Sequence, residues 1–111
     1  MVEGRHVEIA GDDAPEERSP LEAHAAFFRT EPQGIEKLIA SMKLESLTFV
    51  LPPASSDHDT WRRAVAGDLA RAYSPVRINI AAGAKGAALN QVLTYLRDAP
   101  GVTGHYVQAY D

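Results

Sequence analysis

LTFVLPP, residues 47–53, is the stretch of the sequence that decides the fold. Its first five residues form a nearly continuous apolar run, which is typical of a strand covered by helices on both faces of a parallel sheet. The two prolines end the strand abruptly, because proline cannot donate to a sheet ladder. We therefore predict a buried, central strand over Leu47–Leu51.

Strand and helix patterns alternate on both sides of this run. Further strands are expected over residues 6–10, 76–81 and 104–109, and helices over 20–30, 35–43, 59–73 and 84–97. Strands separated by helices predict a parallel sheet with right-handed crossovers. The fold class is α/β, a three-layer α/β/α domain with about four parallel strands in the order β-α-α-β-α-β-α-β. Rossmann-like and flavodoxin-like arrangements both satisfy this pattern.

The first long helix has a clear start. Ser19 can cap it, Pro20 suits its first position, and Glu22 can bond back to the cap. Spacing of three and four residues then predicts one buried face. That face contains Leu21, His24, Ala25 and Phe28.

The last helix is apolar over much of its circumference. One stripe is formed by Leu89, Val92, Leu93 and Leu96. A second face of mostly small residues is formed by Ala84, Ala88, Gln91 and Tyr95. A helix that is apolar on several sides must be buried on more than one of them. This second face predicts self-association, most simply a homo-oligomer; the alternative is that Tyr95 covers a neighbouring loop.

Composition limits the classes of function. The 111 residues suit a single domain over residues 1–111, with residues 1–5 expected to be disordered. The net charge is −4, and Arg62-Arg63 is the nearest approach to a basic cluster. This argues against nucleic acid and against an anionic membrane surface as partners. The absence of cysteine excludes disulfides and thiolate chemistry, and it fits a cytoplasmic protein.

The carboxyl ends of the strands are where a ligand is expected in a parallel sheet. The turn Ala82–Gly86 joins a strand to a helix, and Lys85 could add a positive charge for a small anionic ligand. The competing interpretation is that the turn's glycines only permit close packing. The four histidines are scattered, so no metal site is predicted. The residues predicted to line a ligand site are Asp12, Ser55, Gly83, Lys85 and Gly86.

From Leu47 onward the chain resembles a short-chain dehydrogenase/reductase. In that family a strand ending in N-N-A-G precedes a helix with an early tryptophan, here Leu47–Ala54 followed by Trp61 and Leu69. The run 77–82 (RINIAA) is similar to the family's R-I-V-N-I-S-S strand. Residues 81–89 are similar to its Y-x-x-x-K-A-A-L helix. The resemblance implies a Rossmann-like fold.

The departures from the family pattern concern its chemistry. The turn after the first strand has one glycine, Gly11, where the family has a glycine-rich cofactor turn. Lys85 matches the family's catalytic lysine, but Ala81 stands where the tyrosine should be. Without that hydroxyl, the proton donor for carbonyl reduction is missing. We therefore expect a small Rossmann-like domain without a cofactor and without catalysis, acting through protein–protein contacts. The alternative is a protein that binds a small molecule or a nucleotide at Gly83–Gly86.

Overall fold

The computed structural model describes residues 5–12, 14–30 and 34–110, with the backbone alone at residues 28–30. Residues 1–4, for which we predict disorder, lie outside this range, as do Asp13 and the loop 31–33. Arg5 belongs to the sheet edge. Its carbonyl accepts hydrogen bonds from the backbone N–H groups of Glu45 (2.9 Å) and Ser46 (3.1 Å).

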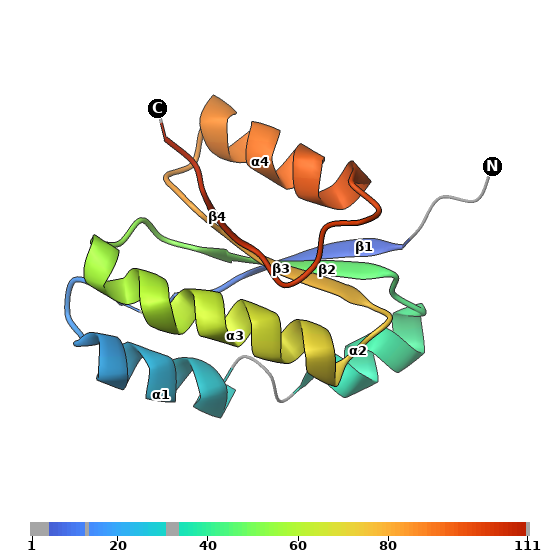
Figure 1. Ribbon diagram of the computed structural model, residues 1–111, viewed down its shortest axis with the longest axis horizontal. Helices are drawn as coiled ribbons and strands as arrows, with labels where there is room; N and C mark the ends of the chain where they lie inside the picture. The colour runs from blue at the N-terminus through green and yellow to red at the C-terminus, as the bar shows by residue number, and fades with distance from the viewer. Residues whose placement is uncertain (1–4, 13, 31–33, 111) are drawn as a thin grey trace.

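Four parallel strands form one sheet in the order β1-β2-β3-β4 (Figure 1). In chain order the elements are β1 (His6–Ala10), α1 (Pro20–Thr30), α2 (Ile35–Met42), β2 (Ser46–Leu51), the short 3-10 helix η2 (Ser56–His58), α3 (Asp59–Ala72), β3 (Arg77–Ala82), α4 (Ala87–Asp98) and β4 (Tyr106–Gln108). The predicted fold class and element order are confirmed. The strand containing LTFVL is an inner strand, as expected.

Helices cover both faces of the sheet. Figure 1 shows α1, α2 and α3 on one face and α4 on the other. Along the sheet, each strand lies next to the strand that precedes it in the sequence, in the order β1 to β4. The connections through α3 and α4 therefore both move one strand in the same direction, but they cross opposite faces of the sheet. Such crossovers must have opposite hands, and the prediction of right-handed crossovers throughout is therefore wrong. The reason is steric, because α3 already packs on both β3 and β4 and α4 takes the other side.

Each inner strand supplies side chains to two cores. On β2, Leu47, Phe49 and Leu51 face the helices α1 to α3, whereas Val50 packs beneath α4. On β3, Ile78 and Ile80 face the first layer and Ala81 the second. This period of two, with both faces covered, explains why LTFVL reads as a continuous apolar run.

The start of α1 is as predicted, but its buried face is not. The backbone N–H of Ser19 donates to Glu22 Oε1 (2.9 Å), and the N–H of Glu22 donates to Ser19 Oγ (3.2 Å). Leu21, expected in the core, is 80% exposed. Ala23 and Phe27 are buried instead, and the Phe27 ring lies 5.3 Å from the ring of Phe49. The side chain of Phe28 lies outside the described residues.

Two elements are shorter than the sequence predicts. Helix α4 begins at Ala87, because Ala84, Lys85 and Gly86 belong to the turn after β3. Strand β4 covers only Tyr106–Gln108. The start of α4 falls three residues later than predicted, which leaves Ala84 outside the helix on whose second face it was predicted.

Candidate functional site

The carboxyl ends of the strands lie at one edge of the sheet, and the ladder extends one residue beyond them. The N–H of Gly11 donates to the carbonyl of Val50 (2.9 Å), and the N–H of Gly83 donates to that of Leu51 (3.2 Å). The segments that follow β1, β2 and β3 therefore leave the sheet side by side. This is the edge at which parallel sheets bind ligands.

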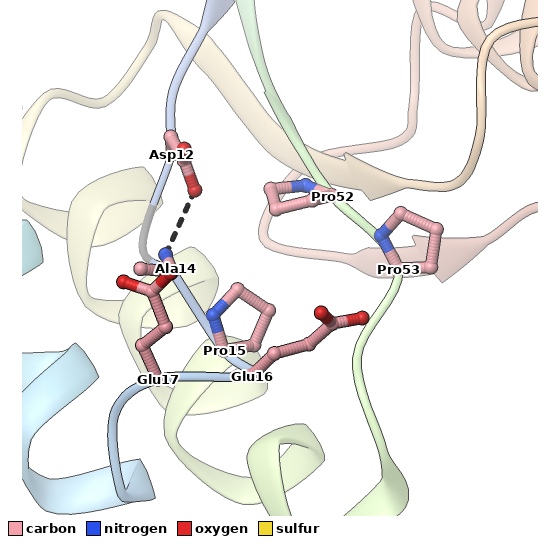
Figure 2. A pocket seen from close by; sticks show the side chains of 7 residues that line it. All are labelled: Asp12, Ala14, Pro15, Glu16, Glu17, Pro52 and Pro53. Carbon is pink, nitrogen blue, oxygen red and sulfur yellow. Dashed lines mark hydrogen bonds between the residues drawn. The ribbon is translucent and has the colours of Figure 1, made fainter.

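A pocket of about 340 Å³ opens where the chain leaves β1 and β2 (Figure 2). Asp12 lies on its wall, and its Oδ1 accepts a hydrogen bond from the N–H of Ala14 (2.8 Å), so this carboxylate supports the turn. Figure 2 shows Glu16 extending toward Pro53 and Glu17 rising beside Ala14. The carboxylates disfavour a phosphate group by charge repulsion. The full lining is Asp12, Ala14, Pro15, Glu16, Glu17, Pro52 and Pro53.

The turn after β3 has glycines for two different reasons. A Cβ added to Gly83 would lie 2.9 Å from the Cβ of Ala109, so the end of β4 leaves no room for a side chain. Gly86 has φ +154°, a backbone conformation that favours glycine, and a Cβ there would meet open space. Lys85 is exposed. The close-packing interpretation therefore holds for Gly83 but not for Gly86, and none of Gly83, Lys85 and Gly86 lines the pocket at Asp12.

Ser55, the remaining residue predicted to line a ligand site, forms a hydrogen bond with a residue close to it in the sequence. Its Oγ donates to Oδ1 of Asp57, and this bond holds the pKa of the Asp57 carboxyl below its usual 3.8. Neither Ser56 nor Asp57 caps the following helix. The N-cap of α3 is His58, without a side-chain cap hydrogen bond, because residues 56–58 form a 3-10 turn that leads straight into the helix.

A buried arginine lies behind the pocket, and the sequence analysis missed it. Arg62 is 0% exposed, and its Nη1 donates to the carbonyl of Pro52 (3.0 Å) and to Oη of Tyr106 (3.1 Å). Gln108 continues the network, since its Nε2 donates to Tyr106 Oη (3.1 Å) and to Asp59 Oδ1 (2.8 Å). This network ties the start of α3 to the ends of β2 and β4.

His58 and Trp61 form a second buried polar contact at the start of α3. The indole N–H of Trp61 donates to Nδ1 of His58 (3.0 Å), and His58 is 2% exposed. Because the indole nitrogen is only a donor, His58 Nδ1 is the acceptor and the neutral ring carries its proton on Nε2. His24 stacks on Trp61 with ring centroids 5.4 Å apart. These contacts give His58 a packing role at the start of α3.

A second hollow, of about 320 Å³, lies between α4 and the end of β4. It brings together three of the four residues predicted for an interface, and Ala84 is not among its lining residues. Two of the lining residues are exposed tyrosines: Tyr95 is 55% exposed and Tyr110 is 76% exposed. All its lining residues are uncharged: Ala88, Gln91, Val92, Tyr95, Gln108, Ala109 and Tyr110. We call this the α4–β4 groove.

Within residues 5–12, 14–30 and 34–110, no group of three or more His, Cys, Asp or Glu side chains could hold a metal ion. In the same residues, no helix has the length and apolar character needed to cross a membrane.

A family model described as SDR-like, short chain dehydrogenase-like protein, matches residues 12–109. This chain belongs to the SDR-like family. The match extends upstream of Leu47, where the resemblance in the sequence begins, and includes the acidic pocket at Asp12. Comparison with curated proteins and with solved structures gave no match.

In this SDR-like domain, Ala81, which the sequence resemblance pairs with the reductases' catalytic tyrosine, is 0% exposed and packs in the core beneath α4. Lys85 lies four residues later, exposed in the turn. The chain thus has the strand, turn and helix that the resemblance implies, but the residue paired with the tyrosine has only a buried methyl group as its side chain.

Proposed function

We propose that this SDR-like domain is non-catalytic and acts by associating with a second copy of itself through the α4–β4 groove. The observation that carries the proposal is the groove itself, which is uncharged and flanked by two exposed tyrosines. Exposed aromatic side chains beside an uncharged surface are typical of protein–protein interfaces, where tyrosine is enriched and charge is depleted.

The chemistry of the strand ends supports the non-catalytic part. A dinucleotide brings a pyrophosphate to the turn after the first strand, where a glycine-rich backbone normally receives it. In this chain Asp12, Glu16 and Glu17 line the pocket at that turn, and their charge opposes such a ligand. The buried methyl group of Ala81 supplies no proton donor.

The assembly is tested by light scattering after size exclusion, at loading concentrations from micromolar to millimolar. We expect the mass of a dimer or higher oligomer, and a shift to the monomer for Tyr95→Glu. Leu21→Glu is the matched control, because Leu21 is also a large exposed apolar residue but lies on α1, on the other face of the sheet. A monomer at all concentrations overturns the proposal. Dissociation by Leu21→Glu with Tyr95→Glu still assembled moves the interface to α1 and overturns it as well.

A small anionic ligand at Gly83–Gly86 is the second candidate. It is favoured by the start of α4, where Gly86 provides no side-chain cap and Lys85 is exposed beside it. Thermal-shift measurements with nucleotides and phosphorylated metabolites test it. A ligand that raises the melting temperature of the wild type but not of Lys85→Ala supports this site. A set of ligands without effect, or with equal effects on both proteins, rejects it.

A further inference from the structure

The edge strand β1 carries polar side chains on the face of the sheet where α4 lies. Its residues pair only with β2 along the sheet, with His6 opposite Ser46 and Glu8 opposite Thr48. Helix α4 packs on β2, β3 and β4. On the other face, Val7 and Ile9 pack against the core beneath α1 to α3. The attachment of β1 therefore depends on one ladder, one apolar face and the polar contacts of His6.

The His6 side chain is largely buried and makes few polar contacts with the described residues. Its side chain is 8% exposed, and its Nδ1 lies 2.5 Å from Oγ of Ser46. Its Nε2 lies 3.5 Å from Oε2 of Glu8, beyond normal hydrogen-bond length. Both His6 Nε2 and Thr48 Oγ1 are buried without a hydrogen-bond partner among the described residues. The ring is thus held by a neutral hydroxyl, in surroundings that solvate a charge poorly.

Charged groups of both signs face the His6 ring, and their effects on its pKa partly cancel. Glu8 comes from β1 itself, Arg77 from β3, and Arg97 and Asp98 from the end of α4. Burial has the largest effect and lowers the pKa of His6 from its usual 6.5. The attraction of Glu8 raises it, and the repulsion of Arg77 and Arg97 lowers it further. The neutral ring is therefore the form that this packing favours.

We propose that His6 makes the attachment of β1 pH-sensitive, so that protonation of its ring favours an open state in which β1 separates from β2 while the rest of the sheet stays folded. In the open state the imidazolium reaches water, which stabilises its charge. Separation also exposes the backbone edge of β2, which could pair with another chain.

Opening of β1 is expected to increase as the pH falls, because protonation of His6 and opening are thermodynamically linked. Well above pH 6.5 the ring is neutral in both states, and the closed strand keeps its full stability. As the pH falls below 6.5, the open strand takes up a proton before the closed strand does. The equilibrium constant for opening then rises by at most about tenfold per pH unit, the limit for one proton. The rise ends once the pH has passed through the lower pKa of the closed state.

Hydrogen exchange followed by mass spectrometry tests the proposal on the whole chain. We expect protection of the segment 5–11, corrected for intrinsic exchange rates, to fall several-fold between pH 7.5 and pH 5.5. The segment 77–82 in β3 should keep its protection over the same range. In His6→Gln, which cannot titrate, the pH effect should disappear. His105→Gln is the matched control, because the His105 side chain belongs to an exposed residue, and it should behave like the wild type.

Two results overturn the proposal. One is unchanged protection of 5–11 in the wild type, and the other is an equal loss in His6→Gln. If that variant does not fold, the ring of His6 can be titrated by NMR in the wild-type protein. We then expect a midpoint below 6.5, with the β1 amides losing protection as the ring titrates. A midpoint at or above 6.5, or opening of β1 together with β3, contradicts it.

Discussion

Gly83 lies so close to Ala109 that its position has no room for a side chain. A Cβ on Gly83 would lie 2.9 Å from the Cβ of Ala109 and 3.4 Å from its carbonyl oxygen. The approach is held by the ladder, in which the N–H of Ala109 donates to the carbonyl of Ala82 (2.8 Å). The turn after β3 and the chain at the end of β4 are therefore closely packed, and Ala109 also lines the α4–β4 groove.

Substitution Gly83→Ala should push the end of β4 away from this turn. We expect the free energy of unfolding to fall by about 1–3 kcal/mol, the usual cost of overpacking a close contact. Urea denaturation followed by circular dichroism measures it. Gly101→Ala is the matched control, because a Cβ there meets nothing within 4 Å. It should change stability by less than about 0.5 kcal/mol, as at most surface positions. An equal effect of both substitutions contradicts the packing explanation.

The fold could be predicted largely from hydrophobic periodicity. The continuous apolar run of β2 and the alternation in β3 follow from inner strands with both faces covered, and the structure has both strands there. The hand of the last crossover could not be predicted, because it depends on α3 covering β4 as well as β3. That is a contact between distant segments. The exposure of Leu21 was missed for a related reason, since Phe27 and not Leu21 meets the core aromatics.

The candidate site was predicted less well. Asp12, predicted at a ligand site, does line a pocket, but its carboxylate also accepts a hydrogen bond from the backbone two residues on, as Asx residues do in turns. The buried network of Arg62 was missed, because the sequence presents Arg62-Arg63 as a charged pair on a helix. One signal was available: Ala66 and Ala70 follow Arg62 at spacings of four on α3, and all three residues are buried. Its acceptors, Pro52 and Tyr106, come from distant segments.

Arg62→Met should destabilise the domain although methionine fills much of the space. The carbonyl of Pro52 and the hydroxyl of Tyr106 lose a charged donor in a buried setting. An unsatisfied buried group costs about 1–3 kcal/mol, and we expect the loss in free energy of unfolding to lie in or above that range. Arg63→Met, one residue further along and exposed, should change stability little. Equal midpoints for the two variants in urea contradict the role of the network.

Arg77 anchors the end of α4 to the sheet. Its Nη1 donates to the carbonyls of Leu96 (3.2 Å) and Ala99 (2.7 Å), and its Nη2 donates to that of Arg97 (3.2 Å). These carbonyls end a helix, where a positive charge also interacts well with the helix dipole. Arg77→Met should therefore lower the free energy of unfolding by about 1–3 kcal/mol, by the strength of bonds to charged groups.

Arg71→Met gives the comparison for Arg77→Met in the same urea experiment. Arg71 pairs with Asp68 on the surface of α3, and both side chains are largely exposed. Such surface pairs contribute about 0–1 kcal/mol. If Arg71→Met is as destabilising as Arg77→Met, anchoring of α4 is not what Arg77 contributes.

The capping pair at the start of α1 should make stability depend on pH in acid. The N–H of Ser19, and then its hydroxyl, hold the pKa of Glu22 below its usual 4.5. A lowered carboxyl pKa stabilises the folded state above pH 4.5, and the contribution is lost as the pH falls through the folded-state pKa. Glu22→Gln keeps the shape of the cap without the charge, so its melting temperature should be below that of the wild type at pH 7, and the difference should shrink as the pH falls through the folded-state pKa. Repeating the pair in Ser19→Ala, which keeps the backbone N–H but removes the hydroxyl, should shrink the pH 7 difference, whereas an undiminished difference would show that the hydroxyl does not contribute.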